Sequence, residues 1–247
     1  MGPPSFPFHV QTSRLIRMQA DPHQVLEALE RLAAEPQALK RFLATVAGFY
    51  AEVDARVSSI SAEQGLEFDC RPGCFHCCPR AGVETELFEI IPVLAQLNRS
   101  PSQRLLRRIV SRSRESRSSF GRGGASFLSL LKFQEPSPRD ARQEEACPFL
   151  SEGLCEIYRV RPLACRLHVS VSSRTCAEAR RPDLPRVFYA AQSRAVSWCV
   201  EKLDRNGMAA FMGSGGLLVQ WIGWEEGEEA CTLRLMGRRY LFSSPES

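Results

Sequence analysis

The sequence lacks the features that would place the chain in a membrane or send it out of the cell. No apolar run approaches the roughly 18–20 residues that a membrane-spanning helix needs. Residues 1–9 lack the charged and apolar segments of a secretory leader, and Phe6 stands where a myristoylation signal requires Ser or Thr. We therefore expect a cytoplasmic protein with no membrane partner.

Strong net charge and nucleotide-binding motifs are also missing. The formal charge is +4, from 32 Lys+Arg and 28 Asp+Glu, and by itself gives no argument for nucleic acid. The short glycine runs at 121–124 and 213–216 lack the strand–turn–helix context of a nucleoside-binding loop, so no motif supports S-adenosylmethionine as a cofactor. No Ser/His/Asp set or carboxylate pair stands out, and the question of enzymatic activity stays open.

Cysteine, by contrast, is abundant and clustered. Four of the ten cysteines fall within residues 70–78, and four more fall within residues 147–176. Structural disulfides are rare in a reducing compartment, so clustered thiols there indicate metal ligands or redox groups. We predict that eight cysteines are metal ligands: Cys70, Cys74, Cys77, Cys78, Cys147, Cys155, Cys165 and Cys176.

The spacing of these cysteines indicates how they would be used. Two residues separate Cys74 from Cys77, so one tight loop can present both sulfurs to one metal, and residues 72–73 (Pro-Gly) predict a turn before them. Cys77 and Cys78 are adjacent, and adjacent side chains of an extended backbone point to opposite faces. We therefore expect sites that combine thiols from both groups. Four thiolates suit either zinc or an iron–sulfur cluster, and the sequence does not separate the two.

Other residues near the clusters are assigned secondary roles. Four arginines lie close to the cysteines in sequence and are predicted to offset the charge of deprotonated thiols: Arg71, Arg80, Arg161 and Arg166. His76 and His168 are alternative ligands. Isolated histidines on loops, however, are more often solvated, or contact a ligand without binding the metal. Cys199 and Cys231 lie outside the clusters and are predicted to be buried core residues.

The hydrophobic periodicity predicts a mainly α-helical fold, with an irregular cysteine-cluster metal-binding core flanked by helices and a small C-terminal β-hairpin. Residues 22–62 are predicted as two helices or one helix kinked at Pro36. Further helices are expected at 86–98, near 105–110 and at 185–204, and residues 134–146 as a linker. The hairpin would pair 217–224 with 232–242 around an acidic turn, although the first arm is also compatible with a buried helix.

Three regions are predicted along the chain: an N-terminal helical region at 1–64, a cysteine-cluster metal-binding domain at 65–205, and a C-terminal tail element at 206–247. An insertion at about 99–122 interrupts the second region, with eight Arg, seven Ser and one acidic residue. Such a stretch suits a basic surface for RNA or an acidic partner. A solvated segment is the reading we favour, because Arg/Ser runs with few aromatics often stay in water.

The cysteine spacing and the segment CEIYRVRPLACR at 155–166 resemble the YkgJ-type cysteine-cluster family, which is named for a CxxCxxCC signature and described as zinc- or iron-chelating. The resemblance runs from about Cys70 to about Pro185, and the eight predicted ligands fall on the family's common cysteine set. Two departures stand out. Three residues separate Cys70 from Cys74 where the signature has two, and the Arg/Ser stretch is this chain's own.

Three functions follow from these observations. The first is a metal-binding protein that holds an iron–sulfur cluster, such as [4Fe–4S], or zinc, and supports redox chemistry or protein modification. The second is a protein methyltransferase, because the resembled family includes flagellin lysine N-methylases. The third is a structural zinc module that presents a basic surface to a protein partner or to nucleic acid. The sequence identifies neither the substrate nor the partner.

Overall fold

A computed structural model describes residues 22–76, 87–99, 147, 149–167, 169–172, 174, 198, 202, 219–223, 230–235 and 238–243. The predicted helix near 105–110 and the linker at 134–146 lie outside these residues. The predicted helix at 185–204 also lies outside them, apart from Trp198 and Lys202. The described part of the chain is mainly α-helical with small antiparallel sheets, as the sequence predicts.

Two helices form the N-terminal part, and a proline separates them. Helix α2 spans Pro22–Ala34 and helix α3 spans Pro36–Glu63. Glu35 between them is extended, with φ −112° and ψ 100°, because a residue that precedes proline is disfavoured in the α region. The sequence left a single kinked helix open as an alternative, and the structure resolves the question in favour of two.

Helix α4, Leu87–Arg99, is the most deeply buried element of the described chain. Its own residues are buried on nearly every face, and a helix that is hydrophobic all round belongs in the interior of a protein. The predicted helix at 86–98 is therefore confirmed, as is the buried stripe of Leu87, Ile90, Ile91, Leu94 and Leu97. Glu89 is also buried, which the sequence did not indicate.

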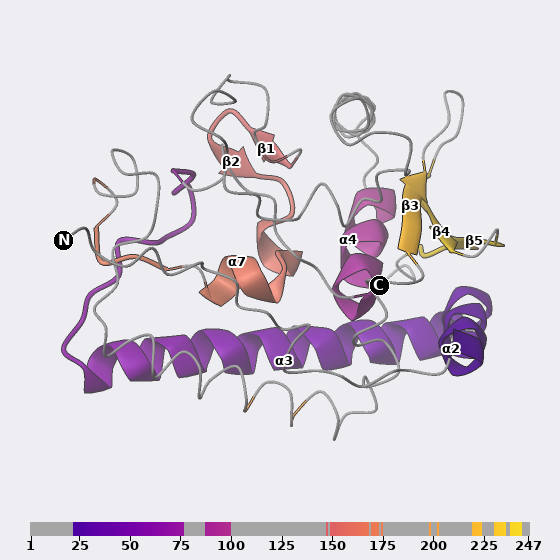
Figure 1. The fold of residues 1–247 in the computed structure, drawn as a ribbon, viewed down its shortest axis with the longest axis horizontal. Helices are drawn as coiled ribbons and strands as arrows, with labels where there is room; N and C mark the ends of the chain where they lie inside the picture. Colours follow the sequence, from indigo (N-terminus) through magenta and orange to yellow (C-terminus); the bar gives the residue numbers. More distant parts are fainter. Residues whose placement is uncertain are drawn as a thin grey trace, which may run out of the picture.

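Helix α3 packs against the other three α-helices of the described chain, α2, α4 and α7. Figure 1 shows it running along one side of the molecule, with α2 at one end and with α4 and the short helix α7, Leu163–Leu167, lying against it. Its buried face carries apolar and aromatic side chains at helical spacing: Ala38, Leu39, Val46, Phe49, Tyr50, Val53, Val57 and Ile60. Burial of this face joins the N-terminal helices to the segment that holds the second cysteine group.

The C-terminal hairpin is confirmed with one added strand. Strand β3, Val219–Gly223, pairs with β4, Thr232–Leu235, and β4 pairs with β5, Arg238–Leu241, all antiparallel. The predicted second arm at 232–242 is therefore two strands, and its first arm is a strand, not a helix. The predicted acidic turn lies outside the described residues.

A second, shorter hairpin was not predicted. Strands β1, Leu150–Ser151, and β2, Leu154–Cys155, are joined by Glu152 and Gly153, both with positive φ (52° and 80°). Positive φ at both central residues defines the type I′ turn that two-residue hairpins prefer. A Glu-Gly pair is a weaker signal for this turn than Asn-Gly or Asp-Gly, which explains the omission.

No helix in the described part of the chain combines the length and the apolar character needed to cross a bilayer.

Candidate metal centre

The first cysteine group is shaped by a tight turn. The backbone N–H of Cys74 donates to the carbonyl oxygen of Arg71 at 2.9 Å, and Gly73 has φ +90°. Proline followed by a positive-φ glycine is typical of a type II turn, so the predicted Pro72-Gly73 turn is confirmed. The turn folds the chain back between Cys70 and Cys74, and both side chains are half-buried.

The β1–β2 hairpin brings the first two cysteines of the second group together. Cys155 stands opposite Leu150 in the strand register, and the N–H of Leu150 donates to the carbonyl oxygen of Cys147 at 3.0 Å. The N–H of Glu156 also donates to the carbonyl oxygen of Phe149 at 2.9 Å. Cys147 and Cys155 therefore lie at the open end of the same hairpin although eight positions separate them in sequence.

The third cysteine of this group, Cys165, lies on helix α7. The chain passes from the hairpin through the 3₁₀ helix η2, Tyr158–Val160, to α7. Leu163 and Leu167 are buried on this helix, and Cys165 between them is half-buried. The burial of its leucines thus holds Cys165 at the edge of the core.

The two cysteine groups meet in the folded chain. The Sγ atom of Cys70 accepts a hydrogen bond from the N–H of Ser170 at 3.2 Å, and the N–H of Asp69 donates to the carbonyl oxygen of Ser170 at 3.0 Å. Ser170 is fully buried and lies five residues after Cys165. The first cysteine loop is therefore joined to the segment that leaves α7.

A second contact joins the same loop to the β1–β2 hairpin. The ring of Phe75 lies so close to Gly153 that a Cβ atom there would stand 3.3 Å from its Cε1. A Cβ atom at Gly73 would stand 3.9 Å from the Cδ2 of Leu154. Glycine at 153 thus allows both the positive φ of the turn and the close approach of the Phe75 ring.

Five of the eight predicted ligands are described, and all five are thiols rather than disulfides: Cys70, Cys74, Cys147, Cys155 and Cys165. Cys77, Cys78 and Cys176 lie outside the described residues, as do His168 and Cys199. His76 is half-buried, and its ring lies 5.1 Å from that of Phe75 between centroids. Cys231 is buried in the core, as predicted.

The donor chemistry of these segments fits a soft metal, because thiolates select zinc or iron–sulfur centres. Within the described ranges alone, however, no three His, Cys, Asp or Glu side chains gather closely enough to hold a metal ion. Three predicted ligands lie outside those ranges. The structure thus brings the cysteine-bearing segments together, and the full ligand set stays a prediction.

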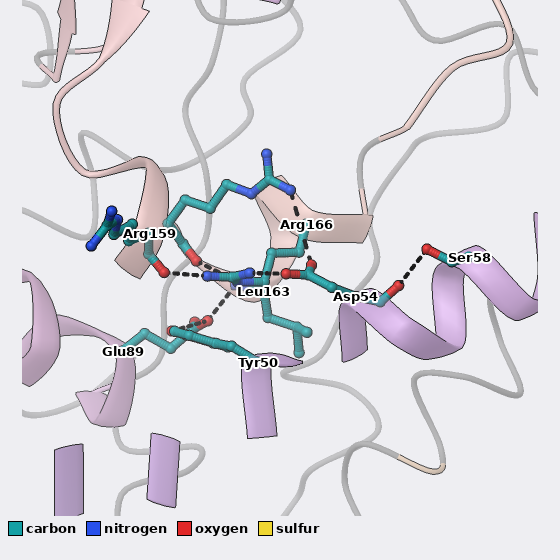
Figure 2. Close-up of polar contacts among 8 residues, drawn as sticks. Tyr50, Asp54, Ser58, Glu89, Arg159, Leu163 and Arg166 are labelled. Carbon is teal, nitrogen blue, oxygen red and sulfur yellow. Dashed lines mark hydrogen bonds and ion pairs between the residues drawn. The ribbon is translucent and has the colours of Figure 1, made fainter. Parts of the chain in front are cut away.

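Beneath α7 lies a polar cluster that the sequence did not identify. The guanidinium of Arg166 forms an ion pair with Asp54 of α3 at 2.5 Å and lies 4.1 Å above the ring centre of Tyr50 (Figure 2). Its remaining donors bind the carbonyl oxygens of Arg159 at 2.5 Å and Arg161 at 3.1 Å. Arg166 therefore ties the loop before α7 to helix α3.

Glu89 of α4 completes this cluster from the other side. Its carboxylate accepts the backbone N–H of Leu163, the first residue of α7, at 2.5 Å, and the Tyr50 hydroxyl at 3.4 Å (Figure 2). Burial raises the pKa of Tyr50 well above its usual 10.0, and the Glu89 carboxylate adds to the rise. Tyr50 thus stays a neutral hydrogen-bond donor beside a buried carboxylate.

The structure gives two of the four arginines a partner that the sequence did not indicate. The described carboxylate partner of both Arg161 and Arg166 is Asp54, at 4.0 and 2.5 Å, and their predicted effect on thiolate charge stays a prediction. Burial lowers the pKa of Arg166, and the nearby Asp54 carboxylate opposes that shift. Asp54 is 112 residues away in sequence, so no local spacing signalled it. Arg71 is exposed, and Arg80 lies outside the described residues.

Residues 69–198 match the family model CxxCxxCC, whose description reads "Putative zinc- or iron-chelating domain". The match covers more than half of the 247 residues, and the chain therefore belongs to this family. No curated protein and no solved structure matches the chain.

Proposed function

We propose that this chain binds zinc or an iron–sulfur cluster through thiolates supplied jointly by its two cysteine groups. The observation that carries the proposal is the junction between Cys70 and Ser170, which unites the two groups across 100 residues of sequence. Without that junction the eight cysteines would be two separate motifs. With it, the first cysteine loop lies against the segment that follows α7, which supports a site drawn from both groups.

The environment of Cys70 supports a role for its sulfur as a ligand. A sulfur atom that accepts a backbone N–H is stabilised as a thiolate, because hydrogen bonding to the charged form of a group favours that form. Hydrogen bonds to ligand sulfurs are also among the factors that tune iron–sulfur clusters. The 3.2 Å contact from Ser170 supplies one such bond before any metal is considered.

Zinc and iron–sulfur clusters differ in what they supply. A closed zinc site stabilises the fold, whereas an iron–sulfur cluster carries electrons. A redox role, or support of a protein modification, therefore belongs to the iron–sulfur alternative. The basic-surface alternative stays a prediction, since nearly all of residues 99–122 lies outside the described ranges. The methyltransferase alternative also stays a prediction, since it depends on the family resemblance alone.

The test is the metal content of protein purified without oxygen, read by elemental analysis and absorbance. A broad band near roughly 400 nm with iron and sulfide would identify an iron–sulfur cluster, whose sulfur-to-iron charge transfer absorbs there. A colourless sample with stoichiometric zinc would identify a structural zinc site. Protein that carries no metal and takes up neither zinc nor iron would contradict the proposal.

A further inference from the structure

We propose that Asp54 on α3 is a positioning residue for the ligand Cys165, because it holds helix α7 in place, together with the contact from Glu89 on α4, before metal binds. This inference rests on the proposed function. It adds that the N-terminal helix α3, which precedes the family match at 69–198, is a working part of the metal centre.

Helix α7 is too short to be stable without help from its surroundings. The helix has five residues, from Leu163 to Leu167, and helices this short are not stable by themselves, since the first turn fixes many dihedral angles for one hydrogen bond. External contacts must therefore hold it. Glu89 provides one at the start of the helix, where its carboxylate accepts the N–H of Leu163.

The residue immediately after Cys165 attaches α7 to α3. Arg166 follows Cys165 directly and is buried, with 5% of its side chain exposed. Its ion pair with Asp54 and its place above the Tyr50 ring attach it to α3. Contacts to α4 and α3 thus hold Leu163 and Arg166, which lie before and after Cys165 on α7.

Metal binding costs conformational entropy when a ligand side chain must be ordered. A side chain that already occupies its bound position loses less conformational entropy on binding, so a preorganised site binds more tightly. Residues that orient the metal ligands without binding the metal typically contribute roughly 10–100-fold in metal affinity. Asp54 acts on Cys165 only through Arg166 and is not itself assigned as a ligand.

The matched variants are D54N and E52Q. Both neutralise a carboxylate on α3, and both break an ion pair: Asp54 with Arg166 at 2.5 Å, and Glu52 with Lys202 at 3.0 Å. The two acidic side chains are about half exposed, at 46% and 49%, so neither substitution creates a cavity in the core. D54E restores the carboxylate and serves as the rescue variant.

Three measurements are made on each variant. Competition with a chromophoric chelator gives the zinc affinity, and cobalt absorbance reports thiolate coordination. Alkylation of metal-free protein, mapped by mass spectrometry, gives the reactivity of Cys165 relative to the buried Cys231. We expect D54N to bind zinc roughly 10–100-fold more weakly and to expose Cys165 to faster alkylation. E52Q should match the parent chain, and D54E should recover most of the affinity.

The metal affinities of the variants separate the positioning role from the proposed function. If the parent chain binds metal and D54N binds it equally well, or if E52Q loses as much as D54N, the positioning role is wrong while the proposed function stands. If the parent chain takes up no metal, both the proposed function and this inference fail. Thermal unfolding of metal-free D54N verifies that a lost affinity belongs to a folded protein.

Discussion

The sulfur of Cys70 and the backbone N–H of Ser170 lie 3.2 Å apart, although 100 residues separate them in sequence. The bond is formed where the chain leaves α7, and the Asp69 N–H pairs with the carbonyl of the same serine. These two contacts join the described segments that carry the two cysteine groups. Four predictions follow from this arrangement and from the contacts around it.

Serine at Cys70, Cys155 or Cys165 is expected to lower metal binding sharply, whereas alanine at Cys231 is not. Serine keeps the size of the side chain but offers a hard oxygen, which zinc and iron–sulfur centres do not favour. Each loss should exceed the roughly 10–100-fold change typical of residues that orient the ligands without binding the metal. Elemental analysis of purified variants measures it, with C231A as the control because Cys231 is a buried core residue. Full metal content in all three serine variants would contradict the ligand assignment.

Alanine at Gly153 is expected to destabilise the protein. The substitution places a Cβ at φ +80°, a conformation that costs roughly 1–2 kcal/mol for an L-residue, and the new atom would press on the Phe75 ring at 3.3 Å. Thermal unfolding measures the effect, and zinc affinity should fall with it.

The control for Gly153 is G48A, and the opposite sign is expected. Gly48 lies inside α3, with nothing within 4 Å of its added Cβ, and alanine is favoured over glycine in a helix by roughly 0.5–1 kcal/mol. At this chain length that corresponds to a melting temperature higher by roughly 2–4 °C per kcal/mol. A stabilising G153A, or a destabilising G48A, would contradict the backbone argument.

Removal of the Asn98 side chain is expected to cost about 1–3 kcal/mol, because it leaves buried backbone groups without partners. Its amide donates to the carbonyl oxygens of Cys231 (2.9 Å) and Phe242 (2.8 Å) and accepts the N–H of Cys231 at 2.7 Å. This single side chain thus joins α4 to the two residues that flank the open end of the β4–β5 hairpin. Chemical denaturation of N98A measures the loss.

Two variants sharpen the test of Asn98. N98D keeps the acceptor but loses both donors and directs a negative charge at two carbonyl oxygens, so it should be at least as harmful as N98A. Q37A removes an amide from an exposed position of α3 and should change stability by less than about 0.5 kcal/mol. An aspartate variant as stable as the parent chain would show that the donors do not matter.

The pH dependence of stability is expected to reveal the buried phenol of Tyr50. Its pKa is raised in the folded state, so its contribution is fully present below about pH 10, where unfolded tyrosine ionises, and is lost as pH rises further. Y50F removes this contribution. Its free energy of unfolding should therefore fall less steeply above pH 10, by at most about 1.4 kcal/mol per pH unit. Identical slopes for metal-free parent and variant would contradict the shift.

Much of the fold could be predicted because its signals are local. Pro36 divides α2 from α3, the apolar spacing identifies α4, and Pro72-Gly73 produces the turn between Cys70 and Cys74. Each of these depends on residues within one or two turns of backbone. The β1–β2 hairpin was missed because its Glu-Gly turn is a weak local signal.

The partners of α7 could not be predicted, for a different reason. Glu89 lies in a strongly apolar helix, and Asp54 lies among the polar residues of a long surface helix. Neither position is unusual until Leu163 and Arg166 are placed against it. Proximity along the chain drew attention to the thiols near Arg166 and gave no signal for a carboxylate 112 residues away.

The sequence by itself determined the helical segments, the clustered thiols and the class of metal that such thiols prefer, since periodicity, turn chemistry and ligand softness are properties of neighbouring residues. Only the tertiary structure decided that Cys70 meets Ser170 and that Arg166 meets Asp54. Packing of α4 and α7 against α3 brings these distant residues together, and long-range packing leaves no mark on local spacing.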